Sequence, residues 1–172
     1  MVSEVNQVSE VLHFFVDMIP VPQGSKKCFC RGRVASIVEA ATGHAAARKL
    51  VTKTAKEAIE KSGFIKIEKP DPVVLHVEFV YIAPKARKLI DRIAIWRTVA
   101  PDVDKLTRLI GDSLTDAGVY SDDAQIAALH CFKYEVKFAD ASRTERDAGI
   151  YVWVGPLNGS VGEHLALVPK VI

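Results

Sequence analysis

Four stretches of the chain predict β-strands, because each is short, rich in apolar and β-branched residues and bounded by turn-forming residues. They span residues 11–16, 73–82, 126–138 and 150–154. In the third stretch apolar and charged residues alternate, which is typical of a strand that is buried on one face. We therefore expect its apolar face to be buried and Lys133, Glu135 and Lys137 to lie on the solvent side.

Two further stretches predict amphipathic helices, since apolar residues recur at every third or fourth position. The first spans residues 45–62 and the second residues 103–117. Each is followed by a glycine, Gly63 or Gly118, at the position where a left-handed residue commonly ends a helix. Residues 83–101 lie between the second strand and the second helix and show no regular period. A connection of that length is typical of a functional loop.

The order of these elements is strand, helix, strand, long loop, helix, strand, strand. It predicts an α+β fold in which two main helices pack on one mixed β-sheet. The length of 172 residues is in the range of a single domain, so we expect one domain over residues 1–172.

The composition is that of a folded protein from inside the cell. Hydrophobic residues make up 49% of the chain, which excludes intrinsic disorder, and the apolar runs are far shorter than the roughly 20 residues that span a bilayer. The N-terminus carries Glu4 and Glu10 without an apolar signal segment, so we expect a cytoplasmic protein with no membrane partner. Three cysteines fit a reducing compartment, and Cys28 and Cys30 have no second pair at zinc-site spacing.

The net charge of +2 conceals an uneven distribution. Residues 1–100 carry 16 basic and 10 acidic side chains, whereas residues 101–172 carry 7 and 11. A near-neutral total by itself argues against a nucleic-acid partner. However, a basic stretch over residues 85–97 runs directly into six aspartates between positions 102 and 123. The two stretches need different explanations.

Several of these aspartates have the spacing of a metal site. Asp102 and Asp104 begin the predicted second helix, and Asp123 lies in the turn after it. If the turn folds toward the helix N-terminus, the three carboxylates converge and offer the oxygen ligands that Mg²⁺ or Mn²⁺ prefers. Arg108, one turn beyond Asp104, lies on the same helix face. The alternatives are a helix cap for Asp102 or Asp104 and a solvated turn at Asp123.

Three motifs in this segment carry a family resemblance. They are Asp-Val-Asp-Lys-Leu at 102–106, Asp-Ser-Leu-Thr-Asp-Ala-Gly at 112–118 and Asp-Asp-Ala-Gln-Ile at 122–126. In spacing and residue type this run of about 25 residues resembles the RusA family of Holliday junction resolvases from bacteria and their phages. The Pro-Val-Pro-Gln-Gly-Ser-Lys-Lys loop at 20–27 is similar to that of many phage members.

The resemblance implies a homodimeric, Mg²⁺-dependent endonuclease, with Mn²⁺ as the alternative ion. Such an enzyme resolves four-way DNA junctions by paired symmetric nicks in recombination and repair. Carried over by position, the metal ligands would be Asp102, Asp104 and Asp123. Arg108 occupies the position of the family's catalytic lysine, and a guanidinium can clamp a phosphate but donates a proton less readily than an ammonium group.

The basic residues become candidate contacts to the DNA backbone under this interpretation. They are Lys26, Lys27, Arg31, Arg33, Lys85, Arg87, Lys88, Arg92, Arg97 and Lys105. For each of them a solvated surface charge is the alternative. Trp96, in the basic loop, is expected to be a buried anchor, with stacking on an exposed base as the alternative role.

Two other functions are compatible with the sequence. A catalytically silent protein that binds branched DNA would keep the basic loops. The aspartates argue against it, because they repel a phosphate backbone unless a metal is bound. A metal-dependent phosphatase that acts on small molecules is the second, and it would not need the long basic loop.

Overall fold

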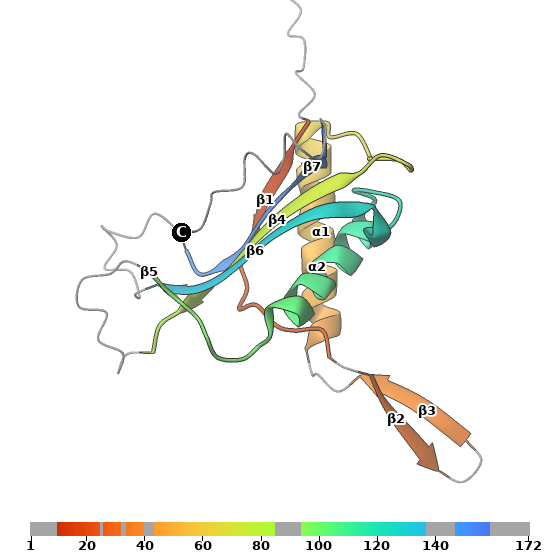
Figure 1. The fold of residues 1–172 in the computed structure, drawn as a ribbon, viewed down its shortest axis with the longest axis vertical. Coiled ribbons are helices and arrows are strands. Elements are labelled where there is room, and N and C mark those ends of the chain that lie inside the picture. The colour runs from red at the N-terminus through yellow and green to blue at the C-terminus, as the bar shows by residue number, and fades with distance from the viewer. Residues whose placement is uncertain are drawn as a thin grey trace, which may run out of the picture.

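The computed structural model describes residues 10–24, 26–31, 34–39, 43–84, 94–136 and 147–158. They form two helices, seven strands and one short 3₁₀ turn among these described segments (Figure 1). The elements are β1 (Leu12–Val16), β2 (Lys26–Arg31), β3 (Val34–Glu39), α1 (His44–Ser62), β4 (Val73–Ile82), β5 (Ala94–Trp96), α2 (Val103–Ala117), η1 (Asp123–Gln125), β6 (Ile126–Val136) and β7 (Gly149–Pro156).

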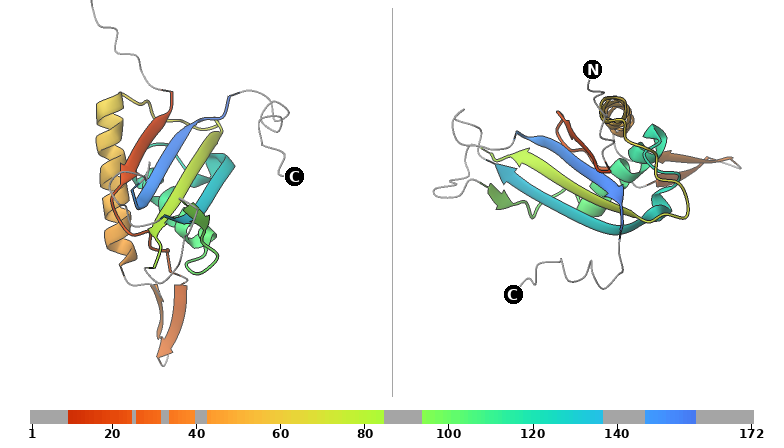
Figure 2. Two further views of the ribbon diagram at one scale, coloured as in Figure 1. Left: turned by 90° about the vertical axis from the view of Figure 1, so that its left-hand side faces the viewer. Right: turned by 90° about the horizontal axis from the view of Figure 1, so that it is seen from above.

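The main sheet has five strands in the order β1-β7-β4-β6-β5. Only β4 and β6 run parallel within it, and the other neighbours are antiparallel. Figure 2 shows both helices on the same side of this sheet. The predicted α+β architecture, with two helices on a mixed sheet, is therefore confirmed.

The core lies between the helices and the sheet face that they cover. In β4 the residues at alternating positions from Val73 to Phe79 are buried, as strand geometry requires for a face packed against helices. The inward positions of α1 are small, with Ala47 and Ala55 on either side of Val51, which lets the helix approach β1 closely. Neither α1 nor α2, the two helices in the described residues, is long and apolar enough to cross a membrane.

Helix α2 has the bounds that its apolar periodicity predicts. Gly118 ends it in the left-handed conformation with φ of 80°, and its backbone N–H donates to the carbonyls of Leu114 and Thr115. The chain then turns back under the helix, where the buried Tyr120 donates its hydroxyl to the carbonyl of Gly111 at 2.9 Å. Burial also raises the pKa of this phenol, which keeps it neutral and able to donate.

The expected orientation of β6 was wrong. Its residues do alternate, but Lys133 and Glu135 face the helix side, and Glu135 is fully buried. Arg97 reaches that carboxylate and forms an ion pair with it, which compensates the charge that burial would otherwise make costly. Phe132 lies on the opposite face of β6, where 36% of its surface is exposed.

Two elements were not predicted. Lys26 and Lys27, at the end of the expected N-terminal basic loop, begin the antiparallel hairpin β2–β3, a separate two-stranded sheet that extends away from the helices and the main sheet in Figure 1. The long loop contains the short strand β5, which pairs with the end of β6. Trp96 of β5 is 68% exposed, so its expected role as a buried anchor was also wrong.

A glycine at the start of β7 provides a test of the packing between β7 and β1. A Cβ atom at Gly149 would lie 2.7 Å from the backbone oxygen of Val16 and would also overlap the ring of Phe15. We expect Gly149→Ala to lower the free energy of unfolding by about 1–3 kcal/mol, because the strands must move apart. Urea denaturation followed by circular dichroism measures the change.

Gly111 is the matched control for this prediction. It lies inside α2, and an added Cβ would meet only ordinary contacts of 3.8 Å or more. Because alanine favours a helix over glycine, Gly111→Ala should stabilise the fold by up to about 1 kcal/mol. Equal effects of the two substitutions would contradict the proposed close contact at Gly149.

Candidate active site

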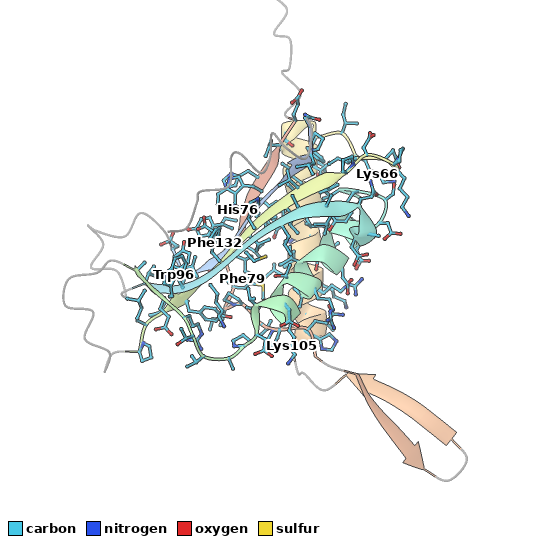
Figure 3. All side chains as sticks on the ribbon, in the orientation of Figure 1. Lys66, His76, Phe79, Trp96, Lys105 and Phe132 are labelled. Atoms are coloured by element: carbon cyan, nitrogen blue, oxygen red, sulfur yellow. The ribbon has the colours of Figure 1, made fainter. Side chains whose placement is uncertain are left out.

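A cavity of about 340 Å³ lies between α2 and the part of β6 that does not pair with β5. Asp104, Arg108 and Asp123 lie together on its wall. The other lining residues are Val103, Thr107, Gly111, Ile126, Leu129 and Cys131. The structure thus brings together three of the four residues for which a catalytic role is expected. Figure 3 shows the side chains of this region around α2.

Helix geometry places the first two residues of the cavity. Asp104 and Arg108 are four positions apart, so they lie one above the other on the same face of α2. Three residues further on, Gly111 brings no side chain to this face. The Cβ of Asp123 lies 3.8 Å from the position that a Cβ of Gly111 would occupy, so η1 packs next to this face of the helix.

Asp123 is held in place by its neighbour Gln125, whose side chain is buried. The Gln125 amide oxygen accepts hydrogen bonds from the backbone N–H groups of Ser121 and Asp122, at 2.9 and 3.0 Å. Its amide nitrogen donates to the backbone oxygens of Asp71 at 3.0 Å and Ile67 at 3.4 Å. All four hydrogen-bonding positions of the amide are used. The turn that carries Asp123 is thereby joined to the segment before β4.

The adjacent Asp122 has a structural role. Its side chain accepts from the N–H of Ala124 and completes a capping box with Gln125, and it also accepts a hydrogen bond from Lys69 at 2.7 Å. The Lys69 ammonium group holds the pKa of this carboxyl below its usual range. Two consecutive aspartates therefore differ in role, because only Asp123 lines the cavity.

Ion pairs separate the six aspartates between positions 102 and 123 into two groups. Four have a basic partner: Asp102 pairs with Lys105, Asp112 and Asp116 with Arg48, and Asp122 with Lys69. Among the described residues, Asp104 and Asp123 have no ion pair within 4.0 Å, and both are exposed. The two aspartates without a basic partner are those that share the cavity with Arg108.

Asp102 lies outside the cavity lining. It occupies the N-cap position of α2, but its side chain makes no capping hydrogen bond. Instead it pairs with Lys105 at 2.7 Å, and that ammonium group lowers the pKa of the Asp102 carboxyl. In the described part of the chain, no three His, Cys, Asp or Glu side chains are grouped closely enough to hold a metal. The structure therefore brings two of the three predicted metal ligands together.

The segment that leads into α2 is anchored by side chains that sequence reasoning missed. Lys133 of β6 donates to the backbone oxygens of Val99 and Pro101, at 2.9 and 2.6 Å. Arg97 donates to the oxygen of Ala100 at 2.8 Å. These contacts fix the residues directly before Asp102. The alternation of β6 had suggested a solvent-facing Lys133, so the sequence offered no signal for this role.

The predicted DNA contacts have varied surroundings. Arg97 is ion-paired to Glu135 and lies 4.4 Å above the ring of Tyr81, and Lys105 pairs with Asp102. Lys26, Lys27 and Arg31 belong to the β2–β3 hairpin. The remaining predicted contacts lie outside the described residues. They are Arg33, Lys85, Arg87, Lys88 and Arg92.

Comparison with protein families shows the family of the chain. The family model for endodeoxyribonuclease RusA matches residues 17–146. The chain belongs to the RusA family. The matched range contains every residue that lines the cavity and the segment that anchors α2. RusA proteins are Holliday junction endonucleases, and the predicted family and enzyme class are confirmed at that level. No curated protein matches the chain significantly.

Gln125 provides a test of how this RusA-family protein positions Asp123. Gln125→Ala leaves four backbone groups without this partner, among them the buried carbonyl of Ile67, and should cost about 1–3 kcal/mol of stability. We also expect DNA cleavage to slow at least about tenfold, because an ångström of misplacement at a catalytic group has effects of that size or larger. Urea unfolding and a cleavage time course measure the two effects.

Asp122→Ala is the comparison for this substitution. It removes the cap and the bond to Lys69 but keeps the amide of Gln125 and its contacts with the segment before β4. Stability should fall by about 1 kcal/mol, the usual cost of a lost cap, while cleavage should slow less than in Gln125→Ala. Wild-type cleavage by a folded Gln125→Ala protein would show that the amide does not position Asp123.

Proposed function

We propose that this RusA-family protein resolves four-way DNA junctions by Mg²⁺-dependent hydrolysis of phosphodiester bonds. Asp104 and Asp123 would hold the metal with Asp102 as a third ligand, and Arg108 would bind phosphate. The observation that carries the proposal is the cavity in which the two aspartates without a basic partner meet an exposed arginine. Two negative charges at close range favour a divalent cation, and the arginine favours a phosphate beside it.

The donor set fits Mg²⁺. This ion keeps several waters and is usually bound through one or two carboxylates and the phosphates of the substrate, so a complete cage of protein ligands is not needed. When bound, it would activate a water and neutralise charge that develops on the phosphodiester. Cys131, a further cavity residue, is a poor competitor, because burial raises the pKa of its thiol and favours the protonated form.

Asp102 would be the third metal ligand, although it lies outside the lining of the cavity. Its carboxylate already lies at the start of α2, next to the anchored segment, and makes no capping bond. Lys105 neutralises it at 2.7 Å in the absence of DNA. A phosphate at the cavity would offer Lys105 a second anionic partner, which would release the Asp102 carboxylate toward Asp104.

Arg108 would orient the substrate. Its guanidinium is exposed at the cavity and presents paired N–H donors that match two phosphate oxygens. An arginine stays protonated at all physiological pH values, so it would stabilise negative charge and not transfer a proton. The proton of the leaving oxygen would come from water.

The protein would act as a homodimer. Resolution of a four-way junction into intact duplexes requires two symmetric nicks, and a two-fold dimer provides two identical cavities related by the symmetry of the substrate. Mn²⁺ is the expected substitute for Mg²⁺ because it accepts the same oxygen ligands.

Cleavage of a synthetic four-way junction tests the proposal. With Mg²⁺, wild-type protein should cut the junction in symmetric strands and leave a linear duplex of the same sequence intact, and EDTA should stop the cutting. Asp104→Asn should abolish cutting but keep junction binding, because it removes a metal-binding charge without removing a basic residue. Gel analysis of end-labelled strands measures cutting, and mobility shift measures binding.

Asp116→Asn is the matched control. Asp116 is on the same helix but pairs with Arg48, away from the cavity, so this variant should cut at the wild-type rate. Cutting of the duplex and the junction at equal rates would contradict selectivity for junctions. Full activity of Asp104→Asn would remove Asp104 from the metal site, and full activity in EDTA would refute metal dependence.

The proposed role of Arg108 has its own test. Arg108→Lys should retain cutting to within about tenfold, because a lysine still supplies a positive charge to the phosphate, whereas Arg108→Ala should lose at least a further tenfold. Single-turnover cleavage at saturating protein separates this effect from binding. Equal rates for the lysine and alanine variants would show that the charge at this position is not used.

A further inference from the structure

The sheet face that the helices leave open carries a continuous line of aromatic rings. Every strand of the main sheet contributes a ring to it: His13, Trp153 and His76 are in register, and Phe132 and Trp96 continue the line diagonally. In the order of the strands they are His13, Trp153, His76, Phe132 and Trp96. Figure 3 labels three of them, His76, Phe132 and Trp96, which follow one another along the sheet. We name this line the ring row.

Neighbouring rings of the ring row are in contact. His13 stacks on Trp153 with centroids 4.7 Å apart, and Trp153 meets His76 edge-on at 4.9 Å. The line continues from His76 to Phe132 at 5.3 Å. Phe132 and Trp96 follow with nearly parallel planes and centroids 6.2 Å apart. These separations are in the range of favourable aromatic pairs, so the rings hold one another in place.

The β5 end of the ring row is open to solvent. Trp96 is 68% exposed and Phe132 is 36% exposed, although both are large apolar side chains. The chain contains two tryptophans, Trp96 and Trp153, and both belong to the ring row. An open aromatic surface of this kind usually marks a binding site.

The charge of this face is compatible with an anionic ligand. Among the described strand residues on the open face, Glu78 is the one carboxylate. It is engaged by the imidazole of His76 at 3.2 Å and by the hydroxyl of Tyr134 at 2.6 Å. In the sequence, Lys85, Arg87, Lys88 and Arg92 come before Trp96.

We propose that the ring row is a stacking platform for unpaired bases of a single DNA strand. Bases of single strands stack on exposed aromatic rings of an open sheet in other nucleic-acid-binding domains. The proposal rests on the proposed junction cleavage for its choice of ligand, because strand exchange at a branch point is where unpaired bases arise. It assigns the bases to the face opposite the one that carries the cavity with Asp104.

A second protein copy fits this face less well than DNA. Homodimer interfaces are more apolar than the rest of the surface at their centres, and charged residues are depleted there. The centre of the ring row instead carries the His76–Glu78 pair, with the exposed His130 beside it. Trp96, which is 68% exposed, lies on the edge strand β5 and not at the centre of the face.

Tryptophan fluorescence tests the proposal directly, since both tryptophans are in the ring row. Full-length protein in EDTA, where no cutting occurs, is titrated with a thymidine oligonucleotide of about a dozen nucleotides and with an abasic strand of the same length. The thymidine strand should quench the emission, and the abasic strand, which has the same phosphates, should quench it much less. Anisotropy of the labelled strand gives the affinity in parallel.

Variants locate the effect on the ring row. Trp96→Ala and Phe132→Ala should each weaken binding of the thymidine strand by about fivefold to a hundredfold, the range for loss of one stacked base. Both side chains are partly or largely exposed, and circular dichroism checks that the variants fold. Ile65→Ala is the matched control, because Ile65 is 70% exposed but belongs to the segment after α1, and its affinity should equal that of the wild type.

Four outcomes would overturn the proposal. The first is equal binding and quenching by the abasic strand, and the second is unchanged affinity in both ring variants. The third is emission that changes with protein concentration alone, which would assign the face to a second copy. The fourth is blue-shifted emission insensitive to both dilution and DNA, which would assign it to residues 159–172 of the same chain. None of these outcomes changes whether the protein cuts junctions or whether Asp104→Asn loses cutting. Failure of the stacking proposal is therefore distinguishable from failure of the proposed function.

Discussion

The parallel pairing of β4 and β6 is the constraint on which the candidate site depends. Two parallel neighbours cannot be joined by a tight turn, so the chain that leaves β4 must cross the sheet and return before β6 can begin. The crossover contains β5, the anchored segment before Asp102, helix α2 and the turn η1. All three acidic candidates and Arg108 are therefore on the connection that this pairing requires. The site is a consequence of how the two central strands are joined.

Long-range contacts decide how the crossover closes. The i, i+4 spacing of Asp104 and Arg108 could be predicted from the helix period, because helix geometry is local. The approach of Asp123 could not, because it depends on where the turn after Gly118 goes. The amide of Gln125 fixes that direction by bonding to the carbonyls of Ile67 and Asp71, far away in sequence. A single sequence contains no signal for such a pairing.

The same reasoning explains where the sequence-based interpretation of β6 failed. Alternation predicts which residues share a face, but not which face turns toward the core. A charged residue such as Glu135 is expected to face solvent unless an ion-pair partner is known. That partner, Arg97, comes from the loop in which no period was found. By contrast, the bounds of β4 were predicted well, because two prolines and a run of β-branched residues define them locally. Sequence patterns therefore predicted an element correctly where neighbouring residues define its bounds.

The acidic residues of the crossover fall into two groups, those that pair with a basic side chain and those that do not. Of the six aspartates between positions 102 and 123, four are balanced by Lys69, Lys105 and Arg48. The fold pairs four of these carboxylates with basic side chains and leaves Asp104 and Asp123 to be balanced by something else. Net charge is therefore a poor guide to the ligand of this protein. The distribution of ion pairs is more informative, because it shows where a counter-charge is still required.

Strand β6 links the two faces of the sheet. From Ala128 onward its odd-numbered residues, such as Cys131 and Lys133, face the cavity and the anchored segment, and its even-numbered residues, such as Phe132, lie on the face of the ring row. A shift of register by one residue would exchange the two sets. The pairing with β4 is irregular at its start, where Val73 pairs with Ile126 but Val74 with Ala128, so Ala127 is an extra residue. That single inserted residue determines which side chains of β6 point to each side of the sheet. It therefore decides which of them line the cavity and which lie on the open face.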